Sequence, residues 1–241
     1  MPGHDHDLLA PLAAAPRQTA LLFDVDGTLA PIAPRPELAA VPDDVRAELR
    51  RLASRYLLVA CVSGRAGLDA RKLVGVDGIQ YVGNHGLELH PDARTLALAI
   101  ARFRDAVGLP VEDKGVSLAY HYREASDEEA ARTELEGVAQ SALLAGLDAR
   151  WGRKVLEVRP RVDADKGTAV QALLERSGAT RGLYAGDDTT DLDAFRGLGE
   201  AGLEHAVRIA VASEEGPQEL QEAADLVVSG PAEMVEVLRR L

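Results

Sequence analysis

The chain has 241 residues, which fits one large domain or a core domain that carries a smaller one. Its formal net charge of −12 opposes polyanionic partners, so nucleic acid and anionic membranes are excluded as partners. No apolar run reaches the roughly 18 to 20 residues that a membrane span needs. One phosphate group on a small molecule needs only a local cluster of donors and a metal, so a small phosphorylated substrate stays open. We expect a monomer.

The first 17 residues are rich in Ala and Pro and predict a disordered tail. Asp5 and Asp7 stand where a signal peptide carries Lys or Arg, which argues against export. The single cysteine, Cys61, lies inside an apolar run and predicts a buried, inert thiol rather than part of a disulfide framework. These features together favour a cytoplasmic protein.

From Ala20 onward, short apolar runs alternate with longer amphipathic ones, as strands and helices do in an α/β sheet. Residues 21–23 predict a buried strand, and residues 56–62 predict the next. Pro42 and Asp43 open a helix between them. Its apolar residues recur at helical spacing and form one buried stripe, Val45, Leu49 and Leu52.

The second half of the chain continues the alternation. It predicts a helix over 166–175, strands over 182–185, 208–212 and 226–228, and a last helix that begins at Pro231. The fold class is therefore α/β: a Rossmann-like core with a parallel sheet and helices on both faces. We expect residues 18–88 and 161–241 to form this core.

The middle of the chain has a different texture. Residues 116–123 and 154–159 alternate between apolar and polar side chains, which is typical of strands in a half-exposed antiparallel sheet. Between them, Ser126 followed by Glu129 predicts a capping box that opens a helix. We therefore expect a smaller α/β domain, residues 89–160, inserted into the core.

The first candidate site follows the first strand, as Asp24-Val25-Asp26-Gly27-Thr28. Side chains two apart on an extended segment point the same way, so Asp24 and Asp26 can converge at the carboxyl end of the sheet. Gly27 permits a sharp turn there. The alternative interpretation is an ordinary polar turn after a strand.

Two weaker signals lie after later strands and at a helix start. Ser63, Gly64 and Arg65 follow residues 56–62, where a hydroxyl and backbone amides can hold phosphate, although Ser is also a common helix cap. Lys166 opens a helix after Asp165. A cation in the first turn is disfavoured by the helix dipole, so it is more easily explained if it serves an anion than as a surface lysine.

Residues 186–191, Gly-Asp-Asp-Thr-Thr-Asp, form the least ordinary segment of the chain. Asp187, Asp188 and Asp191 repel one another unless something compensates their charge, and oxygen-rich clusters are what Mg²⁺ prefers. An acidic turn with a capping Asp is the plainer alternative.

The four segments, in this order along the chain, resemble the motifs of the haloacid dehalogenase superfamily of phosphatases. The resemblance implies that Asp24 is a covalent nucleophile and Asp26 the general acid and base. It also implies that Mg²⁺ is bound by the Asp24 carboxylate, the Asp26 backbone carbonyl and the Asp187 carboxylate, with Asp188 and Asp191 behind it. The phosphate group would then contact Ser63, Gly64 and Lys166.

Further segments resemble the trehalose-6-phosphate phosphatases: 84–88, 112–115, 121–123, 156–160, and 186–191 running into 192–195. In that family the inserted domain is a cap that closes over the sugar. The resemblance implies a set of residues that bind a sugar-phosphate substrate: Arg65, Asn84, His85, Glu112, Lys114, His121, Arg123 and Glu157. A phosphatase for sucrose 6-phosphate or glycosyl-3-phosphoglycerate remains an alternative, as does a silent sugar-phosphate sensor. The sensor is disfavoured because Asp24 and Asp26 are both present.

Overall fold

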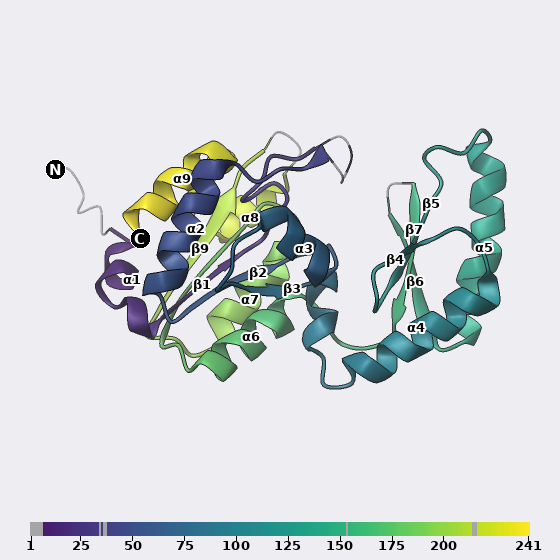
Figure 1. The fold of residues 1–241 in the computed structure, drawn as a ribbon, viewed down its shortest axis with the longest axis horizontal. Coiled ribbons are helices and arrows are strands. Elements are labelled where there is room, and N and C mark those ends of the chain that lie inside the picture. Colours follow the sequence, from purple (N-terminus) through teal and green to yellow (C-terminus); the bar gives the residue numbers. More distant parts are fainter. Residues whose placement is uncertain (1–6, 34, 36–37, 153, 214–215) are drawn as a thin grey trace. The chain divides into compact units, whose positions relative to one another are not determined.

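The computed structural model describes residues 7–33, 35, 38–152, 154–213 and 216–241. The chain divides into two compact units. One consists of Met1–Gly86 and Ala164–Leu241, called the core unit below. The other is Leu87–Asp163, called the cap unit. Figure 1 shows the elements of each unit.

The core unit is built on a six-stranded sheet with the order β10-β9-β8-β1-β2-β3, and every neighbouring pair is parallel. The strands are β1 (Thr19–Phe23), β2 (Leu58–Val62), β3 (Gln80–Val82), β8 (Arg181–Gly186), β9 (His205–Val211) and β10 (Leu226–Val228). The chain order reverses between β1 and β8, which lie side by side. Open parallel sheets bind ligands at such a reversal, beyond the carboxyl ends of the strands.

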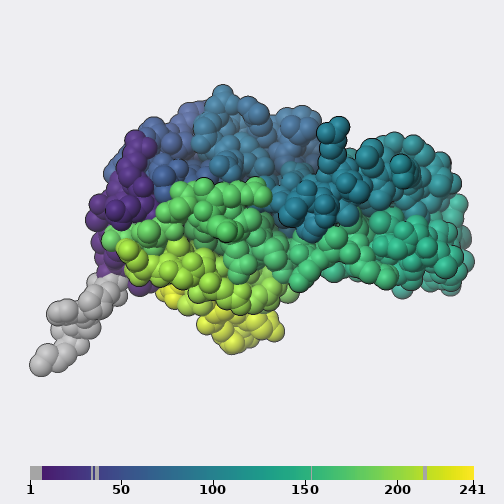
Figure 2. All heavy atoms as spheres, turned by 90° about the horizontal axis from the view of Figure 1, so that it is seen from below, coloured from purple at the N-terminus to yellow at the C-terminus, as the bar shows by residue number. Residues whose placement is uncertain are grey.

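Helices cover both faces of this sheet (Figure 1). On one face, α2 (Asp43–Arg55) and α9 (Pro231–Arg240) pack their apolar stripes on the strands; α2 carries the expected Val45, Leu49 and Leu52. On the other face lie α6 (Lys166–Ser177) and α7 (Asp191–Glu200), which contact each other closely. Figure 2 shows the green residues of α6 beside the yellow-green residues of α7. The core unit also contains α3 (Gly67–Val74) and α8 (Gln218–Ala223).

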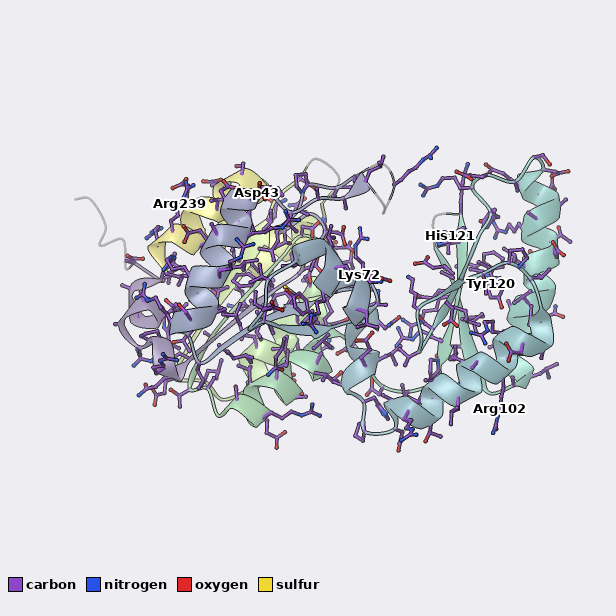
Figure 3. All side chains as sticks on the ribbon, in the orientation of Figure 1. Asp43, Lys72, Arg102, Tyr120, His121 and Arg239 are labelled. Carbon is purple, nitrogen blue, oxygen red and sulfur yellow. The ribbon has the colours of Figure 1, made fainter. Side chains whose placement is uncertain are left out.

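The cap unit has a four-stranded antiparallel sheet with the order β4-β5-β7-β6. Its elements are α4 (Ala93–Val107), β4 (Glu112–Asp113), β5 (Leu118–His121), α5 (Glu128–Leu144), β6 (Leu147–Gly152) and β7 (Val155–Pro160), preceded by the 3-10 segment η3 (Asn84–Leu89). Successive side chains of β5 point to opposite faces of the sheet, as Figure 3 shows for Tyr120 and His121. Tyr120 packs with α4 and α5 in the cap core, whereas His121 is exposed on the opposite face.

Two expectations about helices were wrong. Residues 7–17 are not a disordered tail: they form α1 (Ala10–Ala14) and the start of the 3-10 turn η1 (Pro16–Gln18), with Leu9 and Leu12 buried in the core. Residues 1–6 lie outside the described part. The helix expected at Ser126 instead begins at Glu128, because the Asp127 carboxylate accepts the backbone N–H groups of Glu129 and Ala130. Within the described residues, every helix is too short or too polar to cross a bilayer.

Candidate active site

Asp24 and Asp187 follow adjacent strands, β1 and β8, at the point where the strand order reverses. Phe23 is paired with Ala185 across these strands, and the Asp24 backbone N–H donates to the Ala185 carbonyl at 2.8 Å. Both residues are buried: Asp24 is 5% exposed and Asp187 is 7% exposed. The parallel register therefore brings two acidic residues 163 positions apart in sequence to one edge of the sheet.

The turn after Asp24 is shaped by Gly27, which has a φ of +83°. A β carbon at this position would overlap the carboxylate of Asp187, so only glycine lets the two loops approach this closely. Thr28, fully buried, donates its hydroxyl to Asp187 Oδ1 at 3.2 Å. Both loops are thus locked to each other through Asp187.

Lys166 is the first residue of α6 and is 2% exposed. Asp165 caps the helix: its carboxylate accepts the Thr168 N–H, and the Thr168 hydroxyl accepts the Asp165 N–H in return. This capping box fixes where the helix begins and so aims Lys166 inward. Its ammonium donates to Asp24 Oδ1 at 2.8 Å and to Asp191 Oδ1 at 2.7 Å. These two buried carboxylates stabilise the charge of Lys166 and so compensate the unfavourable interaction of a cation with the helix dipole.

Asp191, the first residue of α7, is fully buried. Its Oδ2 accepts the backbone N–H groups of Asp187 and Asp188 at 3.0 and 2.9 Å. Its Oδ1 accepts the Tyr184 hydroxyl at 2.7 Å as well as Lys166. A carboxylate offers about four acceptor sites, so these four hydrogen bonds use the acceptor capacity of Asp191. Asp191 therefore holds the acidic loop in place.

The site holds more negative charge than its own residues neutralise. Ligand atoms of Asp24, Asp187 and Asp191 lie within 4.8 Å of one another, with Lys166 as the ammonium among them. Burial, reinforced by the neighbouring carboxylates, raises the pKa of Asp24 to about 7 and that of Asp187 to about 8. Burial opposes the charge of Lys166, but Asp24 and Asp191 outweigh it and raise the pKa of Lys166. A hard divalent cation suits this donor set, because it would supply the missing positive charge to carboxylate oxygens.

The proposed acid, Asp26, lies in an ion pair. Arg65 holds its carboxylate with two hydrogen bonds, Nε to Oδ2 at 2.6 Å and Nη2 to Oδ1 at 2.7 Å. Arg65 was expected among the substrate-binding residues, and its contact with Asp26 could not be read from the sequence. The pair links the loop after β1 to the loop after β2.

The loops after β2 and β3 also join. Ser63 is buried, and its hydroxyl accepts the Arg65 backbone N–H at 3.2 Å. The Asn84 N–H donates to the Arg65 carbonyl and the His85 N–H to the Ser63 carbonyl. A β carbon at Gly64 would come within 2.7 Å of the His85 ring, so Gly64 is packed by that side chain. Asn84 and His85 both have a φ of +53°, a left-handed conformation that is uncommon for residues other than glycine but more frequent for Asn and His than for other side chains.

Asp188 differs from its neighbours in the acidic loop. It is exposed, and its Oδ1 accepts the Thr189 backbone N–H at 2.6 Å. It therefore shapes the turn that precedes α7, whereas Asp187 and Asp191 point into the buried cluster.

Four of the expected sugar-binding residues gather on one face of the cap sheet. Glu112 is paired with Ala119, and Ala119 with Glu157, so they share the face opposite the apolar core. His121 Nε2 lies 2.7 Å from Glu112 Oε2, and Lys114 Nζ lies 3.9 Å from Glu157 Oε1. Arg123 is exposed in the turn after β5, which ends at His121 rather than at Arg123.

Sequence reasoning missed two side chains of the core site. Thr28 was identified only as a motif position, and its bond to Asp187 depends on the pairing of distant loops. Tyr184 was taken as an ordinary strand residue. Its hydroxyl, two positions before the acidic loop, was the available signal, because a buried phenol needs a polar partner. Burial and the nearby carboxylates raise the pKa of Tyr184, so it stays a protonated donor.

Comparisons with known proteins agree with this arrangement. The sequence model of the trehalose-phosphatase family matches residues 22–98 and 94–229. The chain is 36% identical to the trehalose-phosphate phosphatase of Mycolicibacterium paratuberculosis over 253 aligned positions, which cover 94% of this chain and 63% of that protein. It thus spans less than two thirds of that curated relative.

Two solved structures share the fold. A trehalose-6-phosphate phosphatase related protein superposes with a TM-score of 0.70 at 22% identity, covering 91% of this chain and 95% of that one. A haloacid dehalogenase-like hydrolase from Bacteroides thetaiotaomicron gives a TM-score of 0.59 at 15% identity, covering 92% and 98%. Since the family model spans most of the sequence and the acidic cluster lies where the sheet reverses, the chain belongs to the trehalose-phosphatase family.

Proposed function

We propose that this chain hydrolyses trehalose 6-phosphate to trehalose and phosphate through an aspartyl-phosphate intermediate on Asp24. The observation that carries the proposal is the buried contact of Lys166 Nζ with Asp24 Oδ1 at 2.8 Å. A nucleophile for a phosphate dianion needs both a fixed position and nearby positive charge, and this contact supplies both. The similarity to a curated trehalose-phosphate phosphatase supports the choice of substrate.

We assign the roles of the core residues as follows. Asp24 attacks phosphorus, and the bond to the sugar oxygen breaks. Asp26 protonates that oxygen as it leaves, and then takes a proton from the water that cleaves the acyl phosphate. Lys166 and the hydroxyl of Ser63, with the backbone at Gly64, neutralise the phosphoryl oxygens. Asp26 must give up its bidentate bond to Arg65 to carry out these transfers.

Mg²⁺ is the cation that we propose for the acidic cluster, because its preferred donors are carboxylate and carbonyl oxygens. The Asp24 carboxylate, the Asp187 carboxylate and the Asp26 backbone carbonyl would hold it, while Asp188 and Asp191 support the loop. When bound, the ion supplies positive charge that cancels repulsion between the nucleophile and the phosphate dianion. Asp191 is left out of the direct ligands because its two oxygens already accept four hydrogen bonds.

We propose that the cap unit selects the sugar. Its polar sheet face carries Glu112, Lys114, His121 and Glu157, which together offer donors and acceptors for sugar hydroxyls. Arg123, Arg65, Asn84 and His85 complete the proposed substrate-binding set. The apolar face of the same sheet is fully used by the packing of α4 and α5, so it has no role in binding.

The test is phosphate release from a panel of phosphate esters with and without Mg²⁺. The panel holds trehalose 6-phosphate, sucrose 6-phosphate, glycosyl-3-phosphoglycerate and an aryl phosphate. We expect Mg²⁺-dependent turnover with kcat/KM highest for trehalose 6-phosphate. A higher kcat/KM for another sugar phosphate would contradict the proposed substrate. Binding of these esters without any turnover would contradict the proposal that the chain is an enzyme.

A further inference from the structure

Tyr184 is a fully buried side chain to which the proposed reaction assigns no role. It lies on β8 with its ring edge-on to Phe195 of α7, the ring centres 6.2 Å apart and the planes at 83°. Its neighbours Leu183 and Ala185 point to the opposite face of the sheet, into the core beneath α2 and α9. The ring is therefore held in one orientation, and the hydroxyl is aimed at the acidic cluster.

The hydroxyl reaches the cluster at a single oxygen. Tyr184 donates to Asp191 Oδ1 at 2.7 Å, the same oxygen that accepts Lys166 Nζ at 2.7 Å. The other oxygen, Oδ2, is taken by the N–H groups of Asp187 and Asp188. Asp191 thus cannot turn about its own side-chain bonds without breaking several hydrogen bonds to a buried charge.

The position of Lys166 is a balance between two carboxylates. Its ammonium lies 2.8 Å from Asp24 Oδ1 and 2.7 Å from Asp191 Oδ1. A hydrogen bond from Tyr184 satisfies part of the acceptor capacity of Asp191 Oδ1 and so weakens that oxygen's pull on the ammonium. Without it, Lys166 would be drawn toward Asp191 and away from Asp24 and from the phosphoryl group.

We propose that Tyr184 is a positioning residue of the site, which fixes the Lys166 ammonium against Asp24 by sharing Asp191 Oδ1 with it. The inference rests on the proposed function, in which Lys166 neutralises phosphoryl oxygens. It predicts an effect on the chemical step and on phosphate binding, and little effect on recognition of the sugar.

The test variant is Tyr184→Phe, which removes one oxygen atom and keeps the ring. We expect kcat for trehalose 6-phosphate to fall about tenfold or more, as for loss of a hydrogen bond to a charged group, with a rise in KM that is smaller than the fall in kcat. A conserved kcat with a raised KM would overturn the inference, because it would place Tyr184 in substrate binding alone.

Tyr56→Phe is the matched control. Tyr56 is also buried, at 2% exposure, and its hydroxyl donates to the main-chain oxygen of Leu241 at 2.7 Å, in the α2 and α9 layer. It loses the same atom and a hydrogen bond of the same length, so a comparable drop in Tm is expected with unchanged kcat. Equal losses of kcat in both variants would mean that Tyr184 acts only through stability.

A second readout separates this inference from the proposed function. Inorganic phosphate with Mg²⁺ should raise the Tm of the wild type and of Tyr56→Phe, and raise that of Tyr184→Phe clearly less, because the displaced ammonium binds the anion weakly. If the wild type hydrolyses no phosphate ester, the proposed function fails, and the phosphate-induced shift still decides the role of Tyr184. Equal shifts in both variants, or no shift in the wild type, would overturn the inference.

Discussion

The Asp187 carboxylate lies directly over the α carbon of Gly27, where a β carbon would overlap it. Gly27 also has a φ of +83°. We therefore expect Gly27→Ala to push Asp187 away from Asp24 and to lower kcat/KM by about a hundredfold, in line with misplaced catalytic groups. Steady-state kinetics over a range of Mg²⁺ concentrations would measure both the loss of kcat/KM and the higher Mg²⁺ concentration needed for half-maximal activity.

Gly178→Ala is the control for backbone strain. Gly178 ends α6 with a φ of +68°, and a β carbon there would meet nothing within 4 Å. Both variants bear a cost of about 1 kcal/mol for the left-handed conformation. Gly27→Ala adds the overlap with Asp187, so its Tm should fall at least as far as that of Gly178→Ala. Activity should fall only in Gly27→Ala, and a similar loss in both would place the effect in stability.

Asp24→Asn should abolish turnover and leave the fold intact. The amide keeps the shape of the side chain but is not an anionic nucleophile, so we expect a loss on the order of a thousandfold or more. Circular dichroism and Tm check the fold, and phosphate release checks turnover. Asp77→Asn, whose side chain is 95% exposed, makes the same chemical change at the surface and should remain fully active. Near-native rates in Asp24→Asn would rule out the covalent mechanism.

The buried acidic cluster predicts how stability depends on pH once metal is removed. Burial first, and then neighbouring carboxylates, raise the pKa of Asp24 to about 7 and of Asp187 to about 8. An unfolded Asp has a pKa of about 3.9. Between this pKa and the raised pKa values of the folded state, the folded metal-free protein therefore binds more protons than the unfolded chain. Its stability should therefore decrease as pH rises from about 4 to about 8.

Mg²⁺ provides the comparison for this prediction. Bound cation keeps the carboxylates ionised and stabilises the folded state by mass action, so the Tm should rise and its fall with pH should flatten. Asp187→Asn removes one of the carboxylates. It should raise the Tm of the protein in chelator and reduce the rise in Tm that Mg²⁺ causes. A Tm in chelator that stays constant across this pH range would show that the charge of the cluster is neutralised in another way.

Cys61 should be inert in the folded protein. It is fully buried on β2, and burial, followed by the charge of Asp24, raises the pKa of its thiol. A disulfide reagent that reports colour on reaction should modify it at least about a hundredfold more slowly in buffer than in denaturant, because the thiolate is the reactive form. Rapid labelling of the native protein would mean that β2 opens readily.

Local patterns were enough to predict most of the core. The apolar stripe of α2 and the Pro231 start of α9 follow from helical spacing and from the fixed φ of proline. The four motif segments lie at the carboxyl edge of the parallel sheet because a strand precedes or a helix begins at each of them. The α/β fold with a separate antiparallel sheet was likewise predicted and confirmed.

Features that depend on distant partners could not be predicted. Leu9 and Leu12 resemble a tail in sequence, and they are buried only because the segment packs on the sheet, with the Arg181 side chain donating to the Pro11 carbonyl. The bonds of Arg65 to Asp26 and of Tyr184 to Asp191 join loops and strands whose pairing no local pattern contains. Ser126 and Asp127 are both good helix caps, and the choice between them depends on the backbone path.

Glu157 of β7 lies on the polar face of the cap sheet, with Lys114 Nζ 3.9 Å from its Oε1. Removing this carboxylate takes away an acceptor for sugar hydroxyls and leaves Lys114 without that neighbouring charge. Glu157→Ala should lower kcat/KM for trehalose 6-phosphate by about ten- to hundredfold, the equivalent of about 1.5 to 3 kcal/mol for a charged hydrogen bond. An aryl phosphate that makes no cap contacts should be hydrolysed as before. Glu136→Ala on α5, 4.0 Å from Arg132 and on the helical side of the cap, removes the same charge without touching that face. It should leave both substrates unaffected, and equal losses for both substrates in Glu157→Ala would assign Glu157 to the structural framework.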